Sequence, residues 1–303
     1  MSWIKQKRVG KQPLRLLMLP LAMLMAWQIG LGAAWADSSA LTRGIQSLQQ
    51  REFATAVEQL SQAVQAGEHL GEAYGHRCLA QLMLGAPAQA VNDCSMSARI
   101  ASGYPKLYFY RGLAQYRLGD FAAAIADFSQ HLQTTAEDAR TYYNRGLAYF
   151  AEGQVDRAIA DYHQALVFAA ALEPLEMSNL YNDLGVAYLS ASKLAEARLA
   201  LDQAVLLGDD DLRAYFNRGC VCHHQGSYAA ALEDFDYVLA QNPYHADSYL
   251  SRGISRQRLG DHAGAASDFQ AAIQQFQAQQ NPVGLQQAKL KLIQLQTERS
   301  VVG

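Results

Sequence analysis

The sequence lacks the short motifs that build most active sites. It has no glycine-rich loop for a phosphate, no metalloprotease helix motif and no serine nucleophile elbow. It has four cysteines in 303 residues, too few for the disulfide framework of a small secreted domain. These absences argue against an enzyme, a small-molecule substrate and a resident cofactor, and leave a binding or structural role.

Basic residues are sparse once the first 36 residues are set aside. The chain has 25 Lys and Arg against 28 Asp and Glu, and five of the basic residues but none of the acidic ones lie in residues 1–36. The remainder therefore has 20 basic and 28 acidic residues, a net charge of −8, with no basic cluster. Such a surface repels phosphate backbones, so nucleic acid is excluded as an expected partner.

The first 36 residues have the pattern of a signal peptide. An apolar run from Leu16 to Gly32 is followed by Ala34-Trp35-Ala36, a small-x-small cleavage site. We expect cleavage after Ala36 and export to the periplasm or another extracytoplasmic compartment. The alternative is an uncleaved anchor, which would be the only contact with a membrane. The basic residues that precede the run are Lys5, Lys7, Arg8, Lys11 and Arg15.

Glycines recur at a constant spacing through the rest of the chain. Successive members are 34 residues apart, except for one step of 39, and Cys78 fills one vacancy. This period is typical of stacked helical hairpins, which bury their apolar faces against each other. It divides residues 37–279 into seven units, followed by a helix and tail at 280–303. The glycines are Gly44, Gly112, Gly146, Gly185, Gly219 and Gly253, and the units are 37–70, 71–104, 105–138, 139–172, 178–211, 212–245 and 246–279.

Within each unit, positions numbered from 1 to 34 keep their residue type. Position 8 is the glycine, position 20 is alanine in all seven units, position 4 is tyrosine in six, and position 24 is large in most. We expect small residues at 8 and 20 to let the two helices approach, and large ones at 4 and 24 to fill spaces between hairpins. Glycines at position 15 suit a left-handed turn, and Asp120, Ser227 and Asp261 can cap the second helix.

This pattern resembles the tetratricopeptide repeat (TPR). The resemblance implies an all-α, right-handed superhelical solenoid of seven antiparallel hairpins, closed by a C-terminal solvating helix over 282–299. It also implies a non-enzymatic scaffold that binds a protein or peptide, in assembly of an envelope or membrane complex. A self-associating structural module is a further alternative.

Two features vary between the units. Arg at position 7 and Asp at position 23 occur together in five units and are lost together in the fifth, as Leu184 and Ala200, which predicts ion pairs within each hairpin. The 39-residue step inserts Glu173–Met177, and we expect the run Ala165–Leu172 to lengthen the preceding second helix until Pro174 stops it. The expected pairs are Arg77–Asp93, Arg111–Asp127, Arg145–Asp161, Arg218–Asp234 and Arg252–Asp268.

The family resemblance places a concave groove along the first helices, at positions 2, 5, 6, 9, 12 and 13. These positions are rich in aromatic and asparagine residues in this chain. Asn144, Asn182 and Asn217 stand one unit apart and suit an extended polypeptide, although solvated asparagines would give the same pattern. The predicted groove residues are Phe109, Tyr110, Tyr116, Arg140, Tyr143, Asn144, Phe150, Asn179, Asn182, Arg213, Phe216, Asn217, His223 and His224, and the same positions include Lys106 and Asp183.

The cysteines offer two further interpretations. Cys220, His223 and His224 share one helix face, so the alternative function is metal binding or delivery, although a fourth ligand is not evident. In the other interpretation Cys222 packs in the core and the histidines line the groove. Cys78 and Cys94 replace a glycine and a large residue of the pattern, and we expect a compact free pair there rather than a disulfide, whose geometry is strict.

Overall fold

The protein is described by a computed structural model over residues 39–100, 106–208 and 210–302. Helices are its only regular elements in these ranges: fifteen α-helices and one short 3-10 helix, η1 (Ala169–Ala171). The predicted signal segment 1–36 lies outside the described residues. None of the described helices has the length and apolar character needed to cross a membrane.

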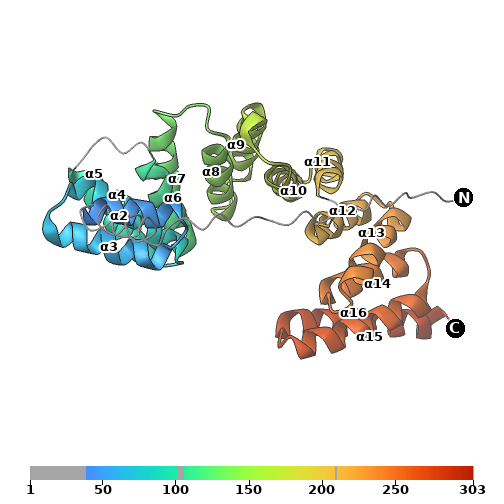
Figure 1. Cartoon of the computed structure of the whole chain (residues 1–303). Helices are drawn as coiled ribbons and strands as arrows, with labels where there is room; N and C mark the ends of the chain where they lie inside the picture. The colour runs from blue at the N-terminus through green and yellow to red at the C-terminus, as the bar shows by residue number, and fades with distance from the viewer. Residues whose placement is uncertain (1–38, 101–105, 209, 303) are drawn as a thin grey trace, which may run out of the picture.

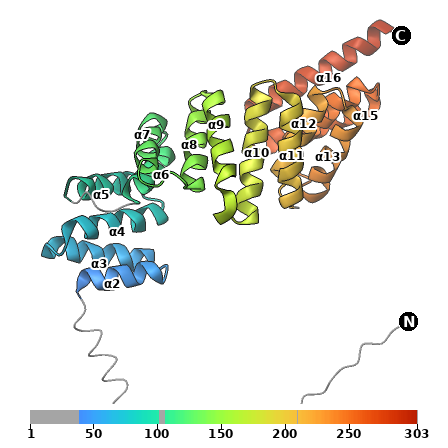
Figure 2. The same cartoon turned by 90° about the horizontal axis from the view of Figure 1, so that it is seen from above.

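The α-helices pair into seven antiparallel hairpins that follow one another along an arc (Figures 1 and 2), which confirms the predicted all-α solenoid. A single helix, α16 (Pro282–Val302), packs against the last hairpin. The hairpins are α2 (Ala40–Gln49) with α3 (Phe53–Ala66), α4 (Leu70–Met83) with α5 (Pro87–Ile100), α6 (Leu107–Leu118) with α7 (Phe121–Leu132), α8 (Ala139–Ala151) with α9 (Val155–Val167), α10 (Pro174–Ser190) with α11 (Leu194–Leu207), α12 (Leu212–His224) with α13 (Tyr228–Gln241), and α14 (Ala246–Arg258) with α15 (His262–Ala278).

The first helices of the hairpins form the inner layer of the arc. Neighbouring first helices touch each other, as α4 touches α6 and α10 touches α12, whereas neighbouring second helices have less contact. A curved stack brings its inner elements closest together. The concave surface is therefore built from α2, α4, α6, α8, α10, α12 and α14.

The repeated glycine makes room for the large residue at position 24 of its own hairpin. A Cβ on Gly112 would lie 2.8 Å from the ring of Phe128, and one on Gly146 would lie 2.6 Å from the ring of Tyr162. The expected contact between the small residues at 8 and 20 is thus only part of the packing. The side chain at position 24 also packs between hairpins as expected, because Tyr162 shares a buried cluster with Leu180 and Leu184 of the next hairpin.

The backbone at position 15 has a left-handed conformation in every unit, which confirms the turn predicted from the glycines at this position. The five glycines there have φ between +74° and +84°. In the two units without glycine, Arg51 and Ser192 take the same conformation, with φ of 62° and 59°. Asp120 and Asp261 cap the helices that follow, as expected, whereas Ser227 makes no capping bond.

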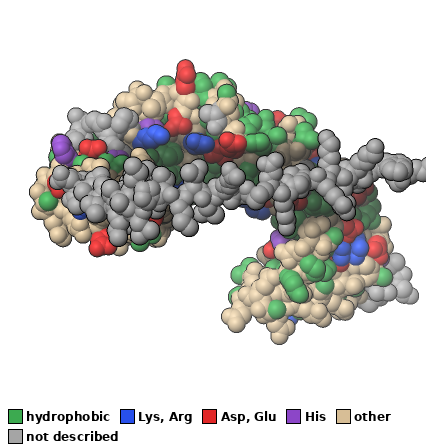
Figure 3. All heavy atoms as spheres, in the orientation of Figure 1, with side chains coloured by type: hydrophobic (Ala, Val, Ile, Leu, Met, Phe, Trp, Pro, Cys, Tyr) green, Lys and Arg blue, Asp and Glu red, His purple; other side chains and the backbone are tan. Residues whose placement is uncertain are grey.

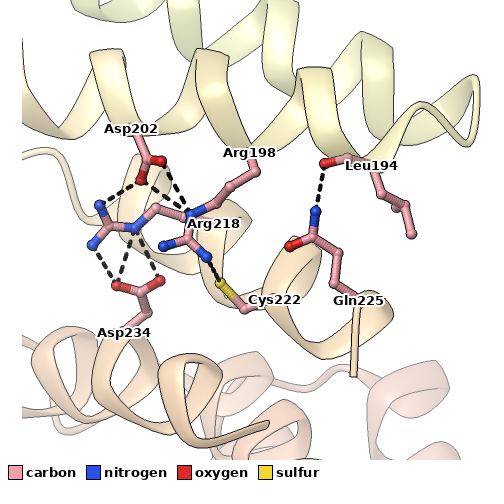
Figure 4. Close-up of polar contacts among 7 residues, drawn as sticks. All are labelled: Leu194, Arg198, Asp202, Arg218, Cys222, Gln225 and Asp234. Carbon is pink, nitrogen blue, oxygen red and sulfur yellow. Dashed lines mark hydrogen bonds and ion pairs between the residues drawn. The ribbon is translucent and has the colours of Figure 1, made fainter. Parts of the chain in front are cut away.

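In five hairpins, the arginine at position 7 joins the two helices of its own hairpin and also binds the preceding hairpin. Arg111 donates to both oxygens of Asp127 at 2.7 Å, which confirms the predicted pairing. Its guanidinium carbon also lies 5.4 Å from the centre of the Tyr108 ring. Its remaining nitrogen donates to Ser95 of the preceding hairpin at 3.2 Å. Figure 4 shows the same arrangement at Arg218, which lies between Asp234 of its own hairpin and Asp202 of the one before.

The fifth hairpin has apolar residues where this arginine and aspartate would stand. Leu184 and Ala200 are both buried. It meets the fourth hairpin through a buried apolar cluster that includes Tyr162 and Leu180, and His163 adds a polar contact, with its Nε2 2.6 Å from the hydroxyl of Tyr188. The α9–α10 contact is the least extensive of the junctions between successive hairpins.

The five inserted residues lengthen the first helix of the fifth hairpin, not the second helix of the fourth. Helix α9 ends at Val167, η1 follows, and Pro174 begins α10 as its first residue. Glu173 and Glu176 form a capping box at this start. The expectation that Pro174 interrupts a helix was wrong, because proline is well suited to the first turn, where its missing N–H is not needed.

Cys78 and Cys94 form a disulfide, with Cα atoms 5.4 Å apart, and the expectation of a free pair was wrong. Both residues are fully buried at the positions where other hairpins pack a glycine against a large side chain. That packing already brings positions 8 and 24 together within a hairpin. The bond therefore replaces the glycine–aromatic contact of its neighbours.

The C-terminal helix α16 covers the last hairpin as predicted. Ala288 and Leu295 are buried, with Leu285 and Leu292 beside them, and Asn281 caps the helix through the N–H of Gly284. Its outer surface carries exposed Gln and Lys side chains, and Val283, Leu290 and Ile293 are exposed there as well.

Replacing Ser192 with glycine should raise the free energy of unfolding by about 1 kcal/mol, because a residue with a Cβ pays roughly that much for a left-handed conformation. Urea denaturation would measure the change. Ser190→Gly, at the last residue of α10, is the control and should lower stability by up to about 0.5–1 kcal/mol, the cost of glycine in a helix. A loss of stability in both variants would contradict the turn assignment.

Replacing Asp127 with alanine should lower the free energy of unfolding by about 3 kcal/mol, because it leaves the Arg111 charge half-buried without its partner. The double variant Arg111→Leu with Asp127→Ala copies the fifth hairpin and should recover most of that loss. Thermal unfolding of the three proteins would show it. Equal stability of the single and double variants would argue that the ion pair has no structural weight.

Candidate functional site

The predicted groove residues lie on four successive inner helices, α6, α8, α10 and α12. Arg140, Arg213 and His224 are exposed, Asn182 is buried, and the other ten are half-buried. The aromatic members use one face for the core: Phe216 contacts Phe235, and Phe150 packs against the cluster around Tyr162. This leaves part of each ring on the concave surface.

A hollow of about 590 Å³ opens at the start of α6 and α8. It brings together Phe109, Tyr110 and Arg140 of the predicted set. Its lining also includes His131, which is buried and whose ring centre lies 5.7 Å from that of Phe109. The other lining residues are Lys106, Thr135, Glu137 and Asp138. Four of the eight, His131 to Asp138, were missed, because they come from α7 and the loop after it rather than from first-helix positions.

Charges of both signs surround this hollow. Arg140 at its rim donates to both oxygens of Glu176, at 2.8 and 2.9 Å, and this hydrogen bond lowers the pKa of Glu176. Both side chains are more than one-third exposed, so the pair contributes little to stability. On the face drawn in Figure 3, basic and acidic side chains are likewise interspersed rather than gathered by sign.

A chain of hydrogen bonds crosses the centre of the concave surface from α8 to α12. The hydroxyl of Tyr143 donates to Asp183 at 2.6 Å, and the amide of Asn182 donates to the other oxygen at 3.1 Å. Asn217 in turn donates to Asn182 at 2.8 Å. Three hairpins are thereby joined through side chains that are 35 to 40 residues apart in sequence.

The predicted row of asparagines is only partly assembled. Asn182 and Asn217 bind each other, whereas Asn144 donates to the carbonyl of Arg140 in its own helix at 2.7 Å. Asn179 accepts from Arg213, whose guanidinium also binds Asp211. The row therefore presents a mixed surface of amide groups, some of which are already hydrogen-bonded to the protein.

Asp183 is the acidic residue within this chain of hydrogen bonds. Burial raises its pKa above the ordinary value, and the hydrogen bonds from Tyr143 and Asn182 offset part of that rise. Burial, followed by the charge of Asp183, raises the pKa of Tyr143 and also that of Tyr116. The carboxylate is thus bound by a phenol of the fourth hairpin.

The alternative metal site is not assembled from the described residues. Cys220, His223 and His224 line a hollow of about 200 Å³, but His223 uses Nδ1 on Ser255 at 2.9 Å. Burial raises the pKa of Cys220 to about 12, so its thiol stays protonated. Within residues 39–100, 106–208 and 210–302, no three His, Cys, Asp or Glu side chains are placed to hold a metal ion. Cys222 is buried beside Arg198, as the packing interpretation predicted (Figure 4).

Comparison with known proteins identifies the repeat. Two family models, both of the tetratricopeptide repeat, match residues 139–169 and 182–246. The first match contains α8 and all of α9, and the second runs from within α10 through α13. These stretches, which carry the central hydrogen-bond chain, are therefore similar to tetratricopeptide repeats.

Solved structures share the fold at low sequence identity. PilF of Pseudomonas aeruginosa superposes with a TM-score of 0.60 at 17% identity, over 74% of this chain and 98% of PilF. YrrB, a TPR protein with an unusual peptide-binding site, gives 0.54 at 21% identity, over 65% of this chain and 97% of YrrB. At these identities the likeness shows the fold alone.

A relative by sequence is NADPH oxidase activator 1 of Rattus norvegicus. It is 36% identical over 87 residues, which are 27% of this chain and 20% of the rat protein. The chain therefore spans about one-fifth of the length of this curated relative.

Replacing Asp183 with asparagine should stabilise the folded chain at neutral pH. A raised pKa means that ionisation opposes folding, so this cost is absent below the ordinary pKa of 3.8 and grows as the pH rises through the raised value. We expect a melting temperature about 2–4 °C higher at pH 7, the shift that roughly 1 kcal/mol produces in a chain of this size, and a smaller gain at pH 4.

The matched control is Glu233→Gln on α13, where the carboxylate is exposed. It should change the melting temperature little at either pH. A lower melting temperature of Asp183→Asn at pH 7 would show that the carboxylate stabilises the folded chain, against this expectation.

Proposed function

Since this chain carries repeats similar to tetratricopeptide repeats, we propose that it is an exported, non-enzymatic scaffold that holds a segment of a partner protein along its concave surface. The observation that carries the proposal is the inner surface from α6 to α12. It combines half-buried aromatic rings, amide groups and a hollow of about 590 Å³ in one continuous layer. Rings that are already held by the core lose little entropy when they bind a partner.

The chemistry of this surface suits an extended polypeptide. Asparagine side chains can donate and accept at once, as a peptide backbone requires. The bound segment would cross the inner helices in turn, from the hollow at α6 towards His223 on α12. YrrB, a protein of the same fold described with a peptide-binding site, supports the idea that such a solenoid can present one.

Export is the second part of the proposal. It is supported by the signal-like sequence of residues 1–36 and by the Cys78–Cys94 disulfide, since disulfides persist in oxidising compartments. We propose that the partner is a component of an envelope or membrane complex that this chain helps to assemble.

Affinity capture from an envelope extract would test the proposal. The bait is the full chain, compared with a groove variant, Asn144→Trp with Arg213→Glu, which adds bulk and reverses a charge on the inner layer. The control variant, Leu199→Trp with Leu206→Glu, makes similar changes at exposed positions of α11 in the outer layer. Circular dichroism would verify that both remain folded.

We expect a partner that is retained by the wild type and by the outer-layer control, and reduced at least tenfold with the groove variant, as measured by quantitative mass spectrometry. A partner that is lost with the outer-layer control and kept by the groove variant would overturn the proposal and place binding on the convex side.

A further inference from the structure

Asp183 differs from the five buried aspartates of the array in having no cationic partner. Asp93, Asp127, Asp161, Asp234 and Asp268 each bind an arginine through both oxygens. Asp183 receives only the neutral donors Tyr143 and Asn182, and it forms no ion pair with any residue that the structure describes. A partly buried carboxylate without a counter-charge is a costly feature for a fold to retain.

The arginine at the start of the neighbouring helix α12 binds other groups. The guanidinium of Arg213 donates to Asp211 and to Asn179. Asp211 is itself an acid, so the Arg213–Asp211 pair adds no net positive charge to the surface around Asp183. The centre of the groove therefore keeps one uncompensated negative charge.

The carboxylate also has unused acceptor capacity. Two oxygens offer about four acceptor sites, and Tyr143 and Asn182 each occupy one. Asp183 lies on a first helix, which belongs to the inner layer, and its side chain is only half-buried. At the same position of the other six units the residue is neutral or a histidine: Thr42, His76, Tyr110, Asn144, Asn217 and Ser251.

The surrounding rings favour a cation as the ligand. The hydroxyl of Tyr143 binds the carboxylate directly, and Tyr116 on α6 is a second half-buried tyrosine of the predicted groove. The faces of such rings attract ammonium and guanidinium groups, most strongly where water is partly excluded. A metal ion fits less well, because Asp183 is the only carboxylate in the hydrogen-bond chain and a metal site needs three or four ligands.

We propose that Asp183 binds a lysine or arginine side chain of the partner segment, as a cation-specific subsite in the groove between Tyr143 and Asn217. This inference rests on the proposed function and specifies which kind of partner side chain the groove would recognise. The net charge of −8 outside the first 36 residues adds a long-range attraction for a basic segment. The cost of the unpaired carboxylate is then offset only in the complex.

Random dodecapeptides displayed on phage and selected against the full chain would test the inference. We expect the selected peptides to share a lysine or arginine at one position. Replacing that residue with glutamine in a synthetic peptide should weaken binding to the wild type at least tenfold. The same replacement should change binding to Asp183→Asn less than twofold, which is the coupling that a double-mutant cycle measures.

Two variants control for indirect effects. Glu176→Gln removes another carboxylate of α10, one that is already paired with Arg140, and should leave the tenfold effect intact. Asp183→Lys should reverse the preference, so that a peptide with glutamate at this position binds better than one with lysine. An asparagine can accept from Asn182 through its Oδ1 and donate from its Nδ2 to the hydroxyl of Tyr143, so a folding defect is not expected in the principal variant.

The outcomes separate the two proposals. Peptides that lose binding to the groove variant Asn144→Trp with Arg213→Glu, but show no coupling to Asp183, would overturn the cationic subsite and leave the groove in place. Peptides that bind this variant as tightly as the wild type, or a selection that yields no binder, would overturn both. Coupling to Glu176 equal to that of Asp183 would also overturn the subsite, because a general charge effect would then explain the preference.

Discussion

The array depends on a repeated arginine that binds two successive hairpins at once. Its guanidinium gives two bonds to an aspartate within its own hairpin and one to a serine or aspartate of the preceding hairpin. A planar guanidinium has donors for both in fixed directions, which a lysine lacks. The glycine–aromatic contact sets the distance between the two helices of a hairpin, and this arginine sets the position of that hairpin on its neighbour. Together they place the first helices side by side and so create the concave layer.

Much of this architecture could be predicted because it repeats. Seven units in phase identify the hairpins, and the joint loss of Arg and Asp in the fifth unit reveals their pairing without any coordinates. Periodicity could not say which of two small or large positions face each other, so the partner of the glycine was missed. It also could not decide whether Pro174 ends one helix or begins the next, because proline is compatible with both. The disulfide depends on the separation of two Cα atoms, which no spacing rule supplies.

The candidate site was less predictable for a different reason. Position numbers place Tyr143, Asn182, Asp183 and Asn217 on one surface, but hydrogen bonds between them depend on the small rotation from each hairpin to the next. The sequence therefore predicts which residues line the groove and leaves open which are already bonded to one another. Asn144 illustrates this: its position matches that of Asn217, yet its amide binds its own helix. The lining residues contributed by the α7–α8 loop follow no periodic rule at all.

The backward direction of the arginine bond has a consequence for how the chain folds. Each arginine finds its second partner on the preceding hairpin, which the ribosome has already synthesised, so a new hairpin can dock as soon as it is complete. The array can thus form progressively from its N-terminus. The fifth hairpin, with Leu184 in place of the arginine, is the one internal hairpin of the described residues that docks without this bond.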